Sequence, residues 1–153
     1  MEIEKKYLGT SFPFDLEQYP YCHIEQSYLS TDPTIRIRKT NDAYFLTVKG
    51  KGDIAREEFE LPLSKDQYHS LLKKTDCRPI IKKRFFVPLD HSLTAEIDVY
   101  TGKLSGLITI EVEFETISAA QSFCPPLWFG KDISTDHRYK NSSLYEHGLP
   151  TEN

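Results

Sequence analysis

The chain has 153 residues, of which 39% are hydrophobic and 27% are charged, as is typical of one globular domain with a hydrophobic core. A formal net charge of -4 excludes a general attraction to nucleic acid, so anion binding would need local clusters of bases. The three cysteines, Cys22, Cys77 and Cys124, form no CxxC pattern, which argues against disulfides and structural zinc. We expect them to be buried thiols.

The N-terminus is charged from its second residue, and no apolar run approaches the roughly 18 residues that a membrane-spanning helix needs. We therefore expect a cytoplasmic protein that binds neither membrane nor nucleic acid. We expect one domain over residues 1–153, as a monomer or a homodimer.

Alternating apolar and polar residues predict strands through the first half of the chain. Residues 2–8 form the first strand, and a loop rich in proline and aromatic residues follows. Turn signals at Asp32-Pro33, Asn41-Asp42 and Gly50 then separate further segments. The strands that we expect there are residues 22–29, 34–39, 44–49 and 56–61.

The second half begins with a capping box, Ser64 with Gln67, which predicts a helix that ends near Asp76. Strands are expected at residues 79–87, 93–100 and 107–115. Ser118 with Gln121 predicts a second, shorter capped helix, and residues 134–144 are expected to be a polar helix or turn. About eight strands in hairpin order predict a mainly β (α+β) protein whose antiparallel sheet closes into a barrel.

Ionisable residues two positions apart recur along these strands, so each set lies on one strand face. A sheet whose polar side faces solvent would explain any single pair, and this alternative stays open for each. The whole set favours a charged interior, because like charges sorted strand by strand repel unless cations and anions are bound there. The sets are Glu2, Glu4 and Lys6; Arg36 and Arg38; Lys49 and Lys51; Arg56, Glu58 and Glu60; Lys82 and Arg84; Glu96 and Asp98; and Glu111 and Glu113.

In their order along the chain, these segments resemble the CYTH or triphosphate tunnel metalloenzyme family. The family includes inorganic triphosphatases, thiamine triphosphatases and class IV adenylate cyclases. The matching segments are ExExK at 2–6, RxR at 36–38, the lysine strand at 47–50, RxExE at 56–60, KxR at 82–84, ExD at 96–98, ExE at 111–113 and a DxRYxNSxL tail at 136–144.

The resemblance implies an eight-stranded closed antiparallel tunnel that binds a small-molecule triphosphate with Mg²⁺ or Mn²⁺. It implies metal ligands at Glu2, Glu4, Glu111 and Glu113, with Glu60, Glu96 and Asp98 as further ligands or water-positioning groups. It implies phosphate contacts from Lys6, Arg36, Arg38, Lys49, Lys82, Arg84 and Lys140. The catalytic residues that we expect are Glu4, Lys6, Arg38 and Glu113.

The expected activity is metal-dependent hydrolysis of inorganic tripolyphosphate, since loops 50–53 and 101–106 offer no aromatic platform for a base. Three enzyme alternatives remain: a thiamine triphosphatase, a nucleoside triphosphatase and a class IV adenylate cyclase. A non-catalytic module that binds polyphosphate or nucleotide is a further alternative. The paired carboxylates favour an enzyme, because they would only repel the ligand of a pure anion binder.

Overall fold

The structure, a computed structural model, describes residues 1–151 and is mainly β. Three α-helices accompany the strands in these residues: α1 (Lys65–Leu72), α2 (Ile117–Ser122) and α3 (Asn141–His147). The nine strands are β1 (Glu2–Leu8), β2 (Tyr21–Thr31), β3 (Thr34–Thr40), β4 (Ala43–Lys49), β5 (Ala55–Arg56), β6 (Glu58–Leu63), β7 (Ile80–Pro88), β8 (Thr94–Tyr100) and β9 (Ile108–Glu113). None of the helices in this part of the chain is long and apolar enough to cross a bilayer.

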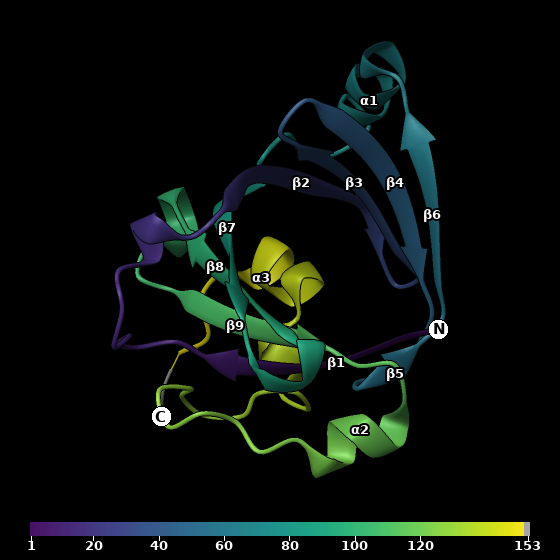
Figure 1. The fold of residues 1–153 in the computed structure, drawn as a ribbon. Helices are drawn as coiled ribbons and strands as arrows, with labels where there is room; N and C mark the ends of the chain where they lie inside the picture. The colour runs from purple at the N-terminus through teal and green to yellow at the C-terminus, as the bar shows by residue number, and fades with distance from the viewer. Residues whose placement is uncertain (152–153) are drawn as a thin grey trace.

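The strands form one antiparallel sheet in the order β5-β1-β9-β8-β7-β2-β3-β4-β6. β5 and β6 stand at opposite ends of this order, yet only Glu57 separates them in the chain, so the sheet curls into a nearly closed barrel (Figure 1). The sequence predicted eight strands, and this was wrong by one. The segment expected as one strand divides at Glu57, because Arg56 pairs with β1 and Glu58 pairs with β4.

Charged side chains line the inside of the barrel, as the alternation predicts. Residues that face each other across paired strands share a side of the sheet. One such row joins Lys6 to Glu111 and Glu111 to Glu96, and another joins Arg84 to Asp98. The apolar residues between them therefore point outward.

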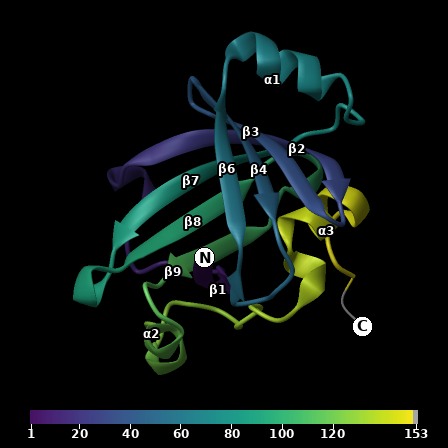
Figure 2. The ribbon, with the colours of Figure 1, turned by 90° about the vertical axis from the view of Figure 1, so that its right-hand side faces the viewer.

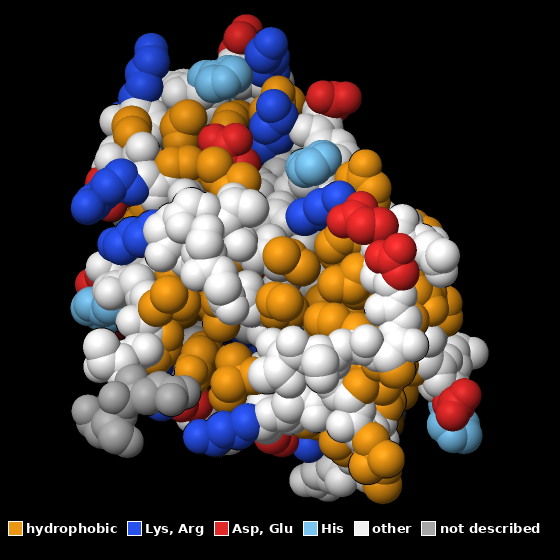
Figure 3. All heavy atoms as spheres, turned by 90° about the vertical axis from the view of Figure 1, so that its left-hand side faces the viewer, with side chains coloured by type: hydrophobic (Ala, Val, Ile, Leu, Met, Phe, Trp, Pro, Cys, Tyr) orange, Lys and Arg blue, Asp and Glu red, His pale blue; other side chains and the backbone are white. Residues whose placement is uncertain are grey.

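The larger hydrophobic core lies outside the barrel wall, over β1, β7, β8 and β9. Ile97, Ile110 and Val112 are fully buried there. Residues 12–19, α2 and the segment 123–129 cover this side, and Figures 1 and 2 show α2 below β1. Figure 3 views the face that carries residues 12–19, where hydrophobic side chains gather and charged ones lie mostly at the rim. The barrel is thus stabilised by packing on its exterior, which leaves its interior free for polar groups.

A smaller core closes the inside of the barrel at one end. Ile80 and Tyr100 from the wall pack there against Tyr139 and Leu144 from the C-terminal tail. Figure 1 shows α3 behind the opening of the ring of strands, and Figure 2 shows that it lies at one end of the barrel. The region predicted as a polar helix or turn is a 3-10 turn, His137–Tyr139, followed by α3. This tail is a plug for the barrel.

The helix boundaries differ from the predictions in two places. Ser64 and Gln67 form the predicted capping box, but α1 ends at Leu72 rather than near Asp76. Thr116, not Ser118, caps α2, because its hydroxyl accepts from the Ala119 amide. A threonine hydroxyl three residues before a free amide is an equally good cap, and the sequence does not rank the two.

The cysteine prediction holds for one residue of the three. Cys22 is buried, whereas Cys77 and Cys124 are exposed in loops. The alternating pattern of β2 fixes the side on which Cys22 lies, but Cys77 and Cys124 lie outside any periodic segment.

Candidate active site

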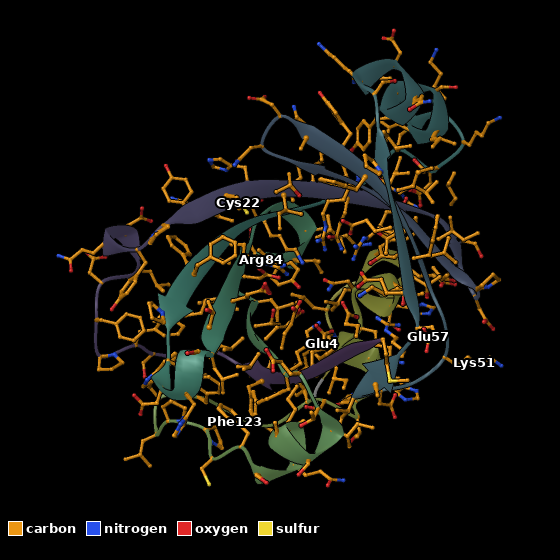
Figure 4. The ribbon with its side chains drawn as sticks, turned by 45° about the vertical axis from the view of Figure 1, so that its right-hand side comes forward. Glu4, Cys22, Lys51, Glu57, Arg84 and Phe123 are labelled. Carbon is orange, nitrogen blue, oxygen red and sulfur yellow. The ribbon has the colours of Figure 1, made fainter. Side chains whose placement is uncertain are left out.

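A polar cavity of about 200 Å³ occupies the interior of the barrel. Figure 4 shows Glu4 and Arg84 directed into the ring of strands, while Lys51 and Glu57 lie at its outer edge. The predicted site residues that line the cavity are Glu2, Glu4, Lys6, Arg36, Arg38, Lys49, Glu60, Arg84, Glu111, Glu113 and Lys140. The predicted residues outside the lining are Lys82, Glu96 and Asp98.

Three of the lining residues form a carboxylate cluster: Glu2, Glu4 and Glu113. Glu2 and Glu4 come from β1, and Glu113 faces Glu4 across the β1–β9 pair. One oxygen from each lies within 4.8 Å of the other two. Burial, with the neighbouring charges of Glu111 and Glu2, raises the pKa of Glu4 to about 8. Such a crowded set of hard oxygen donors fits a divalent cation such as Mg²⁺ or Mn²⁺, which would offset the repulsion.

Arg36 and Arg38 on β3 form a guanidinium pair that no carboxylate neutralises. Within residues 1–151, neither lies within 4.0 Å of an Asp or Glu oxygen. Arg36 donates to the Thr47 hydroxyl at 3.0 Å, and Arg38 donates to the Gln26 side chain. Burial and the neighbouring cations lower the pKa of Arg38 to about 10, which leaves it charged at neutral pH. These two cations remain available for an anion.

The other cavity cations each pair with a carboxylate. Lys49 lies 2.9 Å from Glu2, and Lys6 lies 3.7 Å from Glu111. Lys6 also donates to the Tyr139 carbonyl oxygen at 2.6 Å, which ties the cavity to the tail. An incoming anion would therefore compete with Glu2 and Glu111 for these lysines.

Lys82, Arg84 and Asp98 form a buried triad behind the cavity wall. Arg84 donates from Nε and Nη2 to the two oxygens of Asp98 at 2.7 and 2.9 Å. Lys82 Nζ lies 2.8 Å from Oδ2 of Asp98, outside hydrogen-bonding geometry but in ion-pair contact. Because both oxygens of Asp98 are occupied, the predicted metal role does not fit this residue. The predicted phosphate role does not fit Lys82, which is fully buried and lies outside the lining.

Glu96 also stays apart from the carboxylate cluster. It lies beside Arg84 at 3.5 Å, and burial outweighs this cation and raises the pKa of Glu96 to about 7. Its predicted metal role is thus not supported by its placement. The guanidinium of Arg84 reaches past it toward Glu111, at 3.7 Å, on the cavity surface.

The mouth of the cavity contains residues that the sequence did not single out. Asp53, in the β4–β5 loop, accepts from His137 at 2.7 Å and lies 3.3 Å from Lys140. Lys140 also donates to the Gly52 carbonyl at 3.0 Å. Lys140 thus reaches the cavity, as expected, but in this structure it joins the tail to the loop. A loop carboxylate such as Asp53 has no periodic partner in the sequence that could have revealed it.

Two further lining residues, Tyr28 and Arg56, come from β2 and β5. Tyr28 faces Arg36 across the β2–β3 pair, and alternation along β2 is a signal that could have found it. Arg56 lies 3.9 Å from Glu2, so it joins the carboxylate cluster. Glu58 lies 4.0 Å from Lys49.

The barrel thus encloses both a carboxylate cluster and a guanidinium pair, which are the kinds of groups that suit a divalent cation and a polyanion. No family model matches the chain. An inorganic triphosphatase of Nitrosomonas europaea is 39% identical over 148 residues, which cover 94% of this chain and 95% of that protein. An inorganic triphosphatase of Acetivibrio thermocellus is 30% identical over 145 residues, covering 94% of this chain and 92% of that protein.

A solved crystal structure of an inorganic triphosphatase is 35% identical to this chain, with a TM-score of 0.71. The match covers 99% of this chain and 97% of that one. The chain therefore belongs to the inorganic triphosphatase family.

Proposed function

We propose that this protein hydrolyses the terminal phosphoanhydride bond of inorganic tripolyphosphate with the help of Mg²⁺ or Mn²⁺. We place it within the wider CYTH or triphosphate tunnel group, to which its charged segments are similar. The proposal rests on the presence of a carboxylate cluster and a guanidinium pair in one cavity. The carboxylate cluster is suited to a cation, and the guanidinium pair is free to take a phosphate chain.

The guanidinium pair would bind the non-bridging oxygens of the phosphate chain. Arginine suits this role because its N–H groups form a planar fork that matches two phosphate oxygens. Lys6 and Arg84 would extend the contact deeper into the cavity, since both line it beside Glu111. The bound phosphate chain would then lie across the inside of the barrel, with one end near the carboxylate cluster.

Hydrolysis transfers the terminal phosphoryl group to water. The bond between the terminal phosphorus and its bridging oxygen breaks, and the products are orthophosphate and pyrophosphate. A divalent cation held by Glu2, Glu4 and Glu113 would polarise phosphoryl oxygens and offset the negative charge. The protein cations would stabilise the charge that develops on the oxygens of the transferred group, so the chemistry needs no covalent nucleophile.

Phosphate release from tripolyphosphate tests the proposal directly. With excess Mg²⁺ or Mn²⁺, we expect orthophosphate and pyrophosphate in equal amounts, and with excess EDTA we expect neither. Turnover that persists in EDTA would contradict the metal assignment. Tight binding of tripolyphosphate with no phosphate release would show a binding module instead, and cyclic AMP formed from ATP would show a cyclase.

A further inference from the structure

Gln26 lies between two cavity residues and contacts both. It is fully buried on β2, where it faces Arg38 across the β2–β3 pair. Its Oε1 accepts from Nε of Arg38 at 3.2 Å and from Nη2 at 3.0 Å. Its Nε2 donates to the Tyr28 hydroxyl oxygen at 3.2 Å. One amide therefore joins a guanidinium to a phenol.

Arg38 determines which way this amide is turned. A guanidinium has only donors, so the neighbouring end of the amide must be the oxygen. The reverse orientation would place amide N–H groups against guanidinium N–H groups in a buried site with no acceptor. The amide nitrogen of Gln26 is consequently fixed toward Tyr28.

This orientation in turn determines the role of the Tyr28 hydroxyl. Its oxygen accepts from Gln26, so its own proton must point in another direction. Tyr28 lines the cavity, and within residues 1–151 no protein group accepts this proton. Burial raises the pKa of Tyr28, with the nearby arginines opposing, so the hydroxyl stays protonated at neutral pH. The hydroxyl is a hydrogen-bond donor held toward the cavity.

We propose that Gln26 is a positioning residue that turns the hydroxyl proton of Tyr28 into the cavity while it holds the guanidinium of Arg38. Both donors then meet the anionic oxygens of a bound triphosphate. Gln26 itself touches neither the substrate nor the cation. The inference rests on the proposed function for its ligand, but the hydrogen-bond arrangement rests on the protein alone.

Gln26→Glu tests the arrangement because it keeps the shape of the side chain and removes its donor. A carboxylate still accepts from Arg38, but the Tyr28 hydroxyl must now donate to it and turn its proton away from the cavity. We expect kcat for tripolyphosphate to fall roughly tenfold. This is less than the about 100- to 1,000-fold that follows removal of a donor to developing charge. Gln18→Glu, an exposed glutamine outside the cavity, is the matched control and should leave kcat unchanged.

The Tyr28→Phe background separates this effect from the added charge. The charge acts in both backgrounds, but the reversed hydrogen bond requires the hydroxyl. We expect Gln26→Glu to cost less than about twofold in the Tyr28→Phe protein. Equal losses in the two backgrounds, or no loss in the wild-type background, would overturn the proposal. Gln26→Met serves as the second variant if Gln26→Glu does not fold. It releases both Arg38 and the Tyr28 hydroxyl, so its loss of kcat should be smaller in the Tyr28→Phe protein than in the wild type without vanishing, and an equal loss in both would overturn the proposal.

A measurement without turnover completes the test. Carbon-13 labelling of tyrosine Cζ reports whether a hydroxyl donates or accepts, and Tyr28→Phe assigns the resonance. We expect tripolyphosphate to move this resonance in the wild-type protein and not in Gln26→Glu. A Cζ shift that is the same in both ligand-free proteins would overturn the orientation. If the wild-type protein released no phosphate, the proposed function would fail, and this comparison would still decide the role of Gln26.

Discussion

Nζ of Lys82 lies 2.8 Å from Oδ2 of Asp98, and neither side chain is exposed to solvent. The same carboxylate accepts two hydrogen bonds from Arg84. Asp98 is thus the shared anion of two buried cations, and through Arg84 it is coupled to the cavity. Removal of the charge on Asp98 should therefore affect both the stability of the fold and the residues of the cavity.

We predict that Asp98→Asn lowers the free energy of unfolding by about 3–5 kcal/mol, the usual effect of breaking a buried ion pair. Urea unfolding followed by circular dichroism measures it. Adding Lys82→Met should recover at least about 1 kcal/mol, because no buried cation then lacks its anion. The exposed Asp90→Asn is the control and should change stability by less than about 0.5 kcal/mol. If Asp98→Asn were as stable as the wild type, the triad would contribute nothing to the free energy of unfolding.

The same triad predicts a pH dependence of stability. Burial would raise the pKa of Asp98, but Arg84 and Lys82 outweigh it and hold this pKa well below its ordinary value. Burial also lowers the pKa of Lys82 to about 7, against the pull of Asp98, and Arg84 keeps the Asp98 carboxylate ionised whether or not Lys82 is charged. A depressed folded-state pKa gives stability that is present above the unfolded-state value of about 4 and lost as the pH falls below it.

In the Lys82→Met background, where no buried lysine titrates, the stability difference between Asp98 and Asp98→Asn should therefore be constant from about pH 7 to pH 5 and narrow below about pH 4. Urea midpoints at pH 7, 5, 4 and 3 provide the measurement. A stability difference that stayed constant down to pH 3 would contradict the lowered pKa of Asp98.

We predict that Mn²⁺ binds at the carboxylate cluster and displaces a proton from Glu4. Since the pKa of Glu4 is raised to about 8, the apparent affinity for Mn²⁺ should increase as the pH rises from 6 to 8. Titration calorimetry of Mn²⁺ at several pH values measures this, and Glu4→Gln should weaken binding and flatten the pH dependence.

Activity should follow the same pattern as Mn²⁺ binding. We expect Glu4→Gln and Glu113→Gln each to reduce turnover of tripolyphosphate by about 100-fold or more. Glu57→Gln, an exposed carboxylate at the outer edge of the barrel (Figure 4), is the control. Near-normal turnover in Glu4→Gln would mean that the cluster is structural.

For the guanidinium pair, we predict that Arg38→Ala raises KM and lowers kcat for tripolyphosphate together. A guanidinium bonded to phosphoryl oxygens acts on the bound substrate and on the transition state alike. Lys39→Ala is the control, because Lys39 lies one residue away on the outer face of the same strand and lines a separate surface cleft. Steady-state kinetics of both variants provide the measurement. An unchanged kcat and KM for Arg38→Ala would show that Arg38 does not contact the substrate.

The sequence could predict the barrel interior because strands have a period of two. That period places Glu2, Glu4 and Lys6 on one face, and the same holds for Arg36 and Arg38. Each strand could be oriented in this way before any pairing was known. The order of the charged segments then identified the fold class.

Depth along the barrel could not be predicted, because the period fixes the side of a residue and not its distance from the cavity. Lys82 and Asp98 point inward as expected, but the tail plugs that end of the barrel with Tyr139 and Leu144. Their exclusion from the cavity depends on contacts far apart in the chain. Asp53 was missed for a related reason, since only the folded tail brings His137 and Lys140 to it.

The size and lining of the cavity favour tripolyphosphate over larger substrates. Its volume of about 200 Å³ is below the roughly 300–1,000 Å³ typical of pockets that enclose drug-sized ligands. Its lining is mostly charged, and Tyr28 and Tyr139 are its aromatic residues. Tyr139 is buried in the core of the tail, and the Tyr28 ring packs against Tyr145, so neither ring offers an open face to a base.

A nucleoside would therefore have to stay outside the cavity, where it gains little binding energy. We expect kcat/KM for tripolyphosphate to exceed that for ATP at least about tenfold, which corresponds to roughly 1.4 kcal/mol of transition-state binding. Phosphate release from tripolyphosphate, ATP and thiamine triphosphate, measured with one metal at one pH, provides the comparison. If kcat/KM for ATP or thiamine triphosphate equalled that for tripolyphosphate, the additional binding energy would have to come from groups at the mouth of the cavity. Lys140→Met and Asp53→Asn would then be expected to lower the activity toward that substrate selectively, because these two side chains line the cavity where the tail meets the β4–β5 loop.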